Sequence, residues 1–337
     1  MVTMKDVADY AGVSTATISR ALMNPDMVSV KTRELVQAAV LATGYDVRLS
    51  SRIKNRHHAH IILTVASDLS DVFFNEIIAG IESEAKKNGY LVFVCSGDDI
   101  SIRQNIISNF IMNKQIAGII LLDEKIPINL TKYKEDAFPP MVMICEHASS
   151  IEIPMLHADN LTSAYYAVNY LLKNGHKRIA TITGPQKNGL SSYRLKGYEQ
   201  ALQRSGIEQN PDYIIAGDYS FASGKSATME LLQLRTPPTA IFCHNDLMAI
   251  GAMHSVKSMG LKVPENISII GFDGLEVGTY VIPRLTTIEQ PRFDFGKKAV
   301  ELIVDAVQTG KPIPSSTLME SRWIKGGTVF NLNKIHL

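Results

Sequence analysis

The sequence predicts an all-α domain at the N-terminus, followed by an α/β core of two lobes with parallel sheets. The first 45 residues contain three short helical patterns, and from His60 onward short apolar runs alternate with amphipathic stretches. Such alternation builds parallel sheets from strand–helix–strand units. The strands are too many for one lobe of typical size, and a chain of 337 residues has room for two or three domains.

The first and third helical patterns have clear ends. Thr3 is expected to cap the first helix, and Gly12 is expected to end it. The third helix is expected to run from Val30 to Thr43 and to stop at Gly44. These signals predict a small helical bundle.

The second helix indicates a function. Ser14 is its expected cap. Four side chains share about 140° of its surface, namely Thr15, Ala16, Ser19 and Arg20. Ile18 and Ala21 face the neighbouring helices instead. Small side chains allow such a helix to lie deep in the major groove, where Arg20 can donate two hydrogen bonds to a guanine. DNA binding is therefore favoured over a bundle without a ligand.

The distribution of charge supports this hypothesis, whereas the net charge of +1 says nothing about it. Residues 1–58 hold eight basic and five acidic side chains, and the segment from Val47 to His58 holds four basic ones and no acidic one. A local basic stretch is typical of phosphate contacts, although a solvated linker has the same composition. His57, His58 and His60 lie close together, but a linker does not fix ligand geometry, so we expect no metal site.

The N-terminal residues resemble the helix-turn-helix headpiece of the LacI/GalR repressor family over the run MKDVADYAGVSTATISRALMNPDMVSVKTRELVQAAVLATGY. The specific matches are DVA-x-x-AGVS, the T-x-SR of the second helix, VS-x-KTR and the closing GY. The resemblance implies base contacts by Thr15, Ala16 and Arg20. It also implies phosphate contacts by four hydroxyl side chains, those of Ser14, Thr17, Ser29 and Thr32.

The segment after this headpiece departs from the family pattern. Members of the family carry a proline and then Ala-Arg-x-Leu in a hinge helix, whose leucine wedges a base step apart. This chain has Val47 in place of the proline, Ser51 in place of the alanine and Lys54 in place of the leucine, while Arg52 is kept. A lysine cannot act as an apolar wedge but can bind phosphate. We therefore expect Arg52 and Lys54 to contact DNA from a more flexible hinge, with a less sharply kinked duplex.

The core is expected to contain strands that are buried on both faces. The runs HIILTVA, YLVFVC, GIILL, MVMIC, RIATITG, TAIFC and SIIGF have the continuous apolar character of such strands. Between the first two runs, Ile77, Ile81 and Ala85 recur every fourth residue and Gly89 marks a stop, which predicts an amphipathic helix.

Polar and aromatic residues follow these strands, at the edge where ligands bind to open parallel sheets. The set contains Phe73, Phe74, Asp98, Asp99, Glu146, His147, Arg194, Asn245, Asp246 and Asp273. Each residue by itself could equally be a helix cap or a surface residue. Their joint position predicts a site for a small polar ligand with hydroxyl groups.

The resemblance to the family extends through HADN, HKRIATITGP, PPTAIFCHND, VPENISIIGFD and LTTIEQP. It implies that Arg194, Asn245 and Asp273 hold ligand hydroxyls. It also implies that Phe73, Phe74 and Phe221 pack on a sugar face or a base. The motifs ALMNPD, RLKGY and PPMVM followed by Glu146 agree with the cytidine repressor branch. A nucleoside effector is thus indicated, and a sugar or a purine is the alternative within the family.

These patterns define the expected domains. They are a helix-turn-helix headpiece (1–45), a hinge (46–59) and two lobes that resemble periplasmic binding proteins. The lobes comprise 60–158 with 291–320 and 159–290 with 321–337, with crossovers near Asp159, Gln290 and Glu320. Because one headpiece contacts only a few base pairs, a homodimer is expected to bind the double-stranded operator. Ligand closure of the lobes would then alter operator affinity.

Other classes of protein are less well supported. No P-loop, GxGxxG or HExxH motif is present, so we expect neither an enzyme nor a cofactor. No apolar run approaches the roughly 18 residues of a membrane span, and the start has no secretory signal. Three widely spaced cysteines favour a reducing cytoplasm. A small-molecule binding protein without a DNA-linked response is the alternative of another class.

Overall fold

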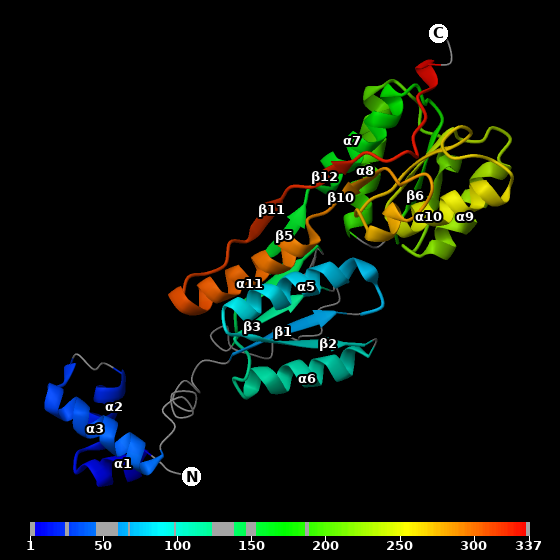
Figure 1. Cartoon of the computed structure of the whole chain (residues 1–337). Helices are drawn as coiled ribbons and strands as arrows, with labels where there is room; N and C mark the ends of the chain where they lie inside the picture. The colour runs from blue at the N-terminus through cyan, green and yellow to red at the C-terminus, as the bar shows by residue number, and fades with distance from the viewer. Residues whose placement is uncertain are drawn as a thin grey trace. The chain divides into compact units, whose positions relative to one another are not determined.

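The computed structural model describes residues 4–23, 27–44, 60–66, 68–97, 99–122, 138–145, 153–185 and 189–334. The chain forms two compact units, Met1–Ala59 and His60–Leu337 (Figure 1). We refer to them as the headpiece and the core, and each is described by itself. The predicted hinge lies outside the described residues.

The headpiece contains α1 (Met4–Ala11), α2 (Thr15–Met23) and α3 (Val30–Thr43). Two of the expected helix ends are confirmed, because Gly12 and Gly44 follow α1 and α3 with φ angles of 64° and 65°. The expected cap of α2 is also confirmed, since the Ser14 hydroxyl accepts a hydrogen bond from the backbone N–H of Thr17 at 3.1 Å. Thr3, the expected cap of α1, lies outside the described residues.

The headpiece has a core of mostly small apolar side chains, those of Val7, Ala8, Ala11, Ile18, Ala21, Val36 and Ala39. Ile18 and Ala21 of α2 are buried, as predicted. The opposite face of α2 is therefore available to a partner.

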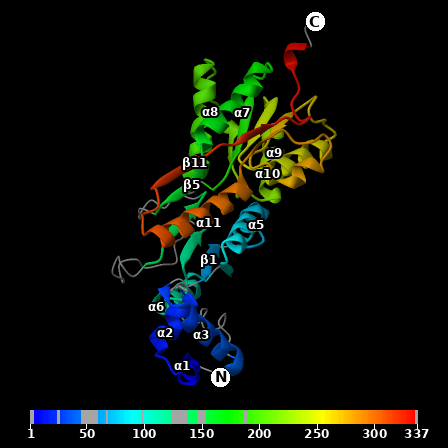
Figure 2. The same cartoon turned by 60° about the vertical axis from the view of Figure 1, so that its left-hand side comes forward.

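The first lobe of the core is built on a six-stranded sheet in the order β11-β5-β4-β3-β1-β2, with every neighbouring pair parallel. The strands are β1 (Ile61–Ala66), β2 (Leu91–Ser96), β3 (Gly118–Leu121), β4 (Met141–Ile144), β5 (Met155–Ala158) and β11 (Ser316–Met319). Helices α5 (Val72–Lys87) and α11 (Arg292–Thr309) lie side by side on one face, and α6 (Ile100–Met112) covers the other (Figures 1 and 2).

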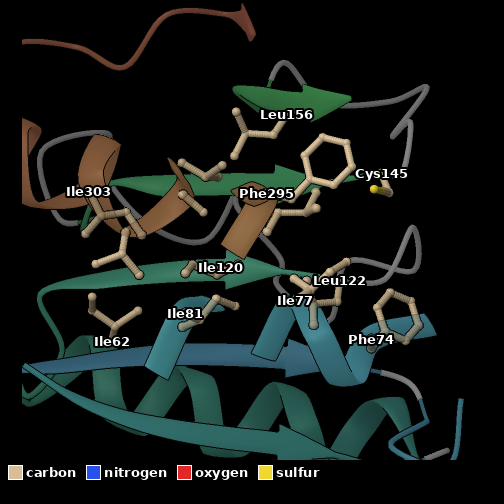
Figure 3. Packing of buried hydrophobic residues seen from close by; sticks show 14 of the residues in the cluster. Ile62, Phe74, Ile77, Ile81, Ile120, Leu122, Cys145, Leu156, Phe295 and Ile303 are labelled. Atoms are coloured by element: carbon tan, nitrogen blue, oxygen red, sulfur yellow. The ribbon is translucent and has the colours of Figure 1, made fainter. Parts of the chain in front are cut away.

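Alternating side chains fill the two faces of this sheet. Ile62 and Ile120 pack toward α5 and α11, where they meet Ile77, Ile81 and Ile303 (Figure 3). Neighbouring strand residues such as Leu63 and Val65 pack with α6 on the opposite face. This two-sided burial explains why the strands are continuous apolar runs.

The predicted burial of the second strand is wrong. β2 is one of the two edge strands, and its Leu91 and Phe93 side chains remain 70% and 48% exposed. The other predicted strands fall at the expected apolar runs. The sequence did not indicate the short strands β5, β7 (Ile214–Ala216), β10 (Thr287–Glu289), β11 and β12 (Arg322–Ile324), because none of them lies in a long apolar run.

The second lobe is built on the parallel sheet β7-β6-β8-β9, which includes β6 (Ile179–Thr183), β8 (Ala240–Cys243) and β9 (Ser268–Ile270). Helices α7 (Asn160–Lys173) and α8 (Gly189–Arg204) pack on one face, and α9 (Phe221–Gln233) and α10 (Asp246–Ser258) pack on the other. Short 3₁₀ helices cover Pro211–Tyr213, Glu276–Thr279 and Leu332–Lys334.

The chain passes between the lobes three times. β5 of the first sheet leads into α7, β10 leads into α11, and β11 leads into β12. β10 and β12 pair with each other in an antiparallel ladder. Among the described residues, no helix combines the length and the apolar character that a membrane span requires.

Candidate functional site

The solvent-facing side of α2 carries the predicted base-reading residues. Thr15, Ala16 and Arg20 are all exposed, and Thr17 is half-buried. Thr15 and Ala16, which share this face with Arg20, have short side chains. A binding partner could therefore approach the helix backbone closely. This arrangement matches the steric requirement of the major groove.

The hydroxyl groups predicted to contact phosphate lie at the starts of α2 and α3. The Ser14 and Thr17 hydroxyls share a hydrogen bond of 2.9 Å, and those of Ser29 and Thr32 share one of 2.8 Å. Backbone N–H groups at a helix start favour an anion. Arg52 and Lys54, the other two predicted DNA contacts, lie outside the described residues.

A pocket opens between the two lobes of the core. We call it the interlobe pocket. It brings together five of the predicted effector residues, Phe73, Phe74, Arg194, Asn245 and Asp273. Four further residues line it, namely Asp71, Leu190, Tyr219 and Leu275.

Aromatic rings form part of this wall. The rings of Phe73 and Phe74 meet edge to face, with centroids 5.4 Å apart. Phe74 is buried in the core of the first lobe, whereas Phe73 is only half-buried. Asp71 caps α5 by accepting a hydrogen bond from the Phe73 N–H at 2.9 Å, which fixes the start of the helix. Phe73 is therefore the ring best placed to meet a ligand.

Arg194 holds the polar wall in place. Its side chain is only 3% exposed, and its Nε donates to the Asn160 Oδ1 at 2.8 Å. One Nη donates to the His244 carbonyl, and the other lies 3.5 Å from an Asp273 carboxylate oxygen. The guanidinium also stacks 3.8 Å above the centre of the Phe272 ring.

Asp273 is a buried carboxylate in an unusual backbone conformation, with φ at 106°. Burial raises the pKa of Asp273 to about 6, although the nearby Arg194 charge and a hydrogen bond from Gln290 oppose this shift. The Gln290 side chain donates to the Asp273 Oδ1 at 2.8 Å. The carboxylate has further acceptor positions, to which a hydroxyl group of a bound ligand could donate.

Asn245 serves the protein itself as well as the pocket. Its Oδ1 caps α10 through the Met248 N–H at 2.9 Å, and its Nδ2 donates to the Tyr219 carbonyl at 2.8 Å. The neighbouring Asp246 accepts hydrogen bonds from the Leu275 N–H and the Thr287 hydroxyl, both at 2.6 Å. Burial and the nearby Asp273 charge hold the pKa of Asp246 well above its usual range.

Some predicted residues lie elsewhere. Phe221 does not line the interlobe pocket, because α9 starts at this residue and its ring packs against His254 of α10, with centroids 5.7 Å apart. It lines a different pocket on that side of the second lobe. Asp99 caps α6 instead of reaching the interlobe pocket. Asp98, Glu146 and His147 lie outside the described residues.

Tyr219 and Asp71 were not predicted. Tyr219 has a φ of 69°, and its ring occupies the space where Gly184 lacks a side chain. No local sequence pattern predicts that Tyr219 lines the pocket. Asp71 could have been found as an aspartate directly before a helix. Within the described part of the chain, no group of three or more His, Cys, Asp or Glu side chains is arranged to hold a metal ion.

Two family models match the chain. The model for bacterial regulatory proteins of the lacI family matches residues 3–46, and the model for a periplasmic binding protein-like domain matches residues 168–329. These matches confirm the predicted fold class.

Curated relatives match over nearly the whole length. The HTH-type transcriptional repressor CytR of Escherichia coli (strain K12) is 46% identical over 97% of this chain and 96% of its own. The HTH-type transcriptional repressor PurR of Aliivibrio salmonicida (strain LFI1238) is 32% identical over 91% of this chain and 93% of its own.

Solved structures agree with these relatives. The lac repressor dimer bound to operator and the anti-inducer ONPF superimposes with a TM-score of 0.77 at 29% identity, over 98% of this chain and 99% of that one. A complex of the transcriptional regulator CelR with cellobiose gives a TM-score of 0.73 at 26% identity, over 97% and 100%. The chain therefore belongs to the lacI family of bacterial regulatory proteins and is a DNA-binding transcriptional repressor with an effector-binding core.

Proposed function

We propose that the chain represses promoters as a homodimer, and that a nucleoside bound in the interlobe pocket changes its affinity for the operator. One observation carries the effector class. The pocket combines the Phe73 ring from the first lobe with the buried Arg194–Asp273 ion pair from the second.

A nucleoside has a chemical group for each of these features. Its base would stack on the Phe73 ring, which stabilises such pairs by about 0.5–1.5 kcal/mol beyond the burial of area. Its ribose hydroxyls would donate to Asp273. Tyr219 lines the pocket where Phe221 was expected, so we assign the second aromatic contact to Tyr219. The resemblance to the cytidine repressor branch supports cytidine among the nucleosides.

A sugar is the second candidate within the family, because a pyranose stacks on the same aromatic ring. The related fold of the regulator that was solved with cellobiose supports this alternative. A purine would stack equally well but would leave Asp273 without a ribose hydroxyl as donor.

On DNA, α2 is the proposed reading helix, with Arg20, Thr15 and Ala16 at base edges. The hydroxyl pairs of Ser14 with Thr17 and of Ser29 with Thr32 are the proposed phosphate contacts. Their position at two helix starts supports this role, since both helix dipoles favour an anion there.

We propose that the dimer interface includes the exposed edge of β2, which a second copy of the chain would cover. An edge strand offers unpaired backbone groups, and this one also exposes Leu91 and Phe93. The similar lac repressor was solved as a dimer. Phe93→Lys should convert the dimer to a monomer in light scattering, whereas Tyr166→Lys, at an exposed tyrosine on α7, should not.

The remaining parts of the proposal follow from this role. Sheet membership supports the division of the core into 60–158 with 291–320 and 159–290 with 321–337. We place the protein in the cytoplasm, where promoter DNA is found and where its three buried cysteines stay free thiols. We also propose that the core binds its effector without turning it over.

Calorimetry against cytidine, adenosine, hypoxanthine, ribose and cellobiose tests the effector class. We expect heat of binding with cytidine, and its loss in Asp273→Asn but not in the α6 cap variant Asp99→Asn. Gel shifts with promoter fragments, with and without saturating cytidine, test regulation. Equal operator affinity in both conditions would refute the regulatory part of the proposal, and binding of cellobiose alone would favour the sugar.

A further inference from the structure

Arg292 joins the two lobes beside the interlobe pocket. Its side chain is only 3% exposed, although it stands at the start of α11, where the chain re-enters the first lobe. One Nη donates to the Asp273 carbonyl, and the other donates to the Gly274 carbonyl at 3.1 Å. The second Nη, which donates to Gly274, also forms an ion pair with the Glu76 carboxylate at 2.9 Å.

Arg292 and Glu76 belong to one rigid part of the first lobe. Glu76 lies on α5, about one turn before Gly80. A Cβ atom at Gly80 would overlap the Phe293 carbonyl, and one at Gly296 would overlap the Ile77 carbonyl. α5 and α11 therefore pack backbone against backbone, so the two ends of the ion pair cannot move far apart.

The carbonyl groups that Arg292 binds belong to the second lobe. The segment 273–275 is anchored there because the Leu275 N–H donates to the buried Asp246 carboxylate at 2.6 Å. Asp273 and Leu275 both line the interlobe pocket. The segment 273–275 thus forms part of the pocket wall and also accepts the hydrogen bonds of Arg292, which belongs to the first lobe.

We propose that Arg292, oriented by Glu76, is a positioning residue of the effector site that ties the pocket wall of the second lobe to the first lobe. Effector binding at Asp273 is thereby coupled to closure of the lobes. Bonds from a guanidinium to carbonyl oxygens are charge-assisted and directional, so they resist a change in the angle between the lobes. The coupling rests on the proposed effector site, whereas the tie between the lobes does not.

Distances between spin labels test the tie in the absence of any ligand. One label is placed at Lys86→Cys on α5 and one at Gln203→Cys on α8, where both side chains are exposed and the three native cysteines are buried. We expect a narrow distance distribution for the parent protein and a broad one for Arg292→Gln. Glu76→Gln should give an intermediate width, and Arg292→Lys should restore part of the narrowing.

The matched control is Lys298→Gln. It removes an ion pair with Glu301 that lies within α11 and does not cross between the lobes. We expect its distance distribution to equal that of the parent. Glu76 is 51% exposed, so Glu76→Gln should fold even if Arg292→Gln does not. Folded Glu76→Gln protein with the parent distribution would overturn the proposal.

Titration with cytidine tests the coupling. We expect Arg292→Gln to weaken cytidine binding by about tenfold and Glu76→Gln by less, while Lys298→Gln leaves it unchanged. If the parent protein does not bind cytidine, the proposed effector is wrong. The spin-label distances still test whether Arg292 ties the two lobes together. If all four proteins bind cytidine equally, Arg292 does not position the site.

Discussion

The headpiece and the core present their candidate binding groups in opposite ways. In the headpiece, Thr15, Ala16 and Arg20 are exposed on one helix. In the core, Arg194 and Asp273 are almost completely buried and bond to segments far away in the chain. The headpiece thus separates the groups that read a partner from those that hold the fold. In the core, the same groups would do both.

This comparison implies the largest effect for Arg194→Ala. The change leaves the Asp273 carboxylate and the Asn160 amide without their buried cation, so unfolding of the core should lose about 3–5 kcal/mol of free energy. Urea unfolding of the full chain, followed by circular dichroism, measures this. Arg178→Ala is the control, because Arg178 is exposed and donates only to the Pro237 carbonyl at 3.0 Å. A loss no greater than in the control would show that Arg194 does not hold the fold.

In the headpiece, Arg20→Ala should affect DNA binding and not folding. The loss of two hydrogen bonds to one guanine should cost about 1–3 kcal/mol of operator binding and relax specificity at that base pair. Fluorescence anisotropy with a duplex selected from a random library, and with its single-base variants, measures both effects. Lys5→Ala, at an exposed lysine of α1, is the control. An equal loss on all duplexes would assign Arg20 to phosphate instead.

The buried carboxylate of the pocket predicts a pH dependence that the exposed headpiece face lacks. The pKa of Asp273 is raised to about 6 by burial, against the lowering influence of Arg194 and Arg292. Ligand hydroxyls donate best to the ionised form, so cytidine affinity should level off well above pH 6 and fall by up to about tenfold per pH unit well below it. Calorimetry between pH 5 and pH 8 checks this.

The sign follows from the two protonation states. Below pH 6 the empty pocket holds a proton that the ligand must displace, so binding releases protons and is weakened by acid. The nearby Asp71 charge also raises the pKa of Asp273, so the variant Asp71→Asn should lower the midpoint of this profile. Binding that is independent of pH across this range would mean that Asp273 does not contact the ligand.

The smallest effect should come from a helix cap in the headpiece. Ser29→Ala removes the acceptor for the Thr32 N–H and should destabilise α3 by about 1 kcal/mol. Hydrogen exchange of the full chain, read on peptides from α3, measures the loss, and Ser29→Thr should keep most of the protection. Peptides from the core should exchange as before. A loss of protection in the core would show that the stability of the core depends on the headpiece.

The three helices of the headpiece, the cap of α2, the glycines that end α1 and α3, and the exposed face of α2 could all be predicted from the sequence. It also determined most strands of the core. These features depend on side-chain periodicity and on residues such as Gly44 that suit one backbone conformation, so a short window of sequence contains them.

Which strands lie at the edges of the sheet, and which residues line the interlobe pocket, became clear only from the folded structure. Phe221 and Tyr219 are two residues apart, yet only Tyr219 lines that pocket. The ion pair between Arg292 and Glu76 could not be predicted from the sequence either, since it joins helices that are far apart along the chain. Such contacts depend on how whole elements pack, and packing is a property of the folded chain and not of any local pattern.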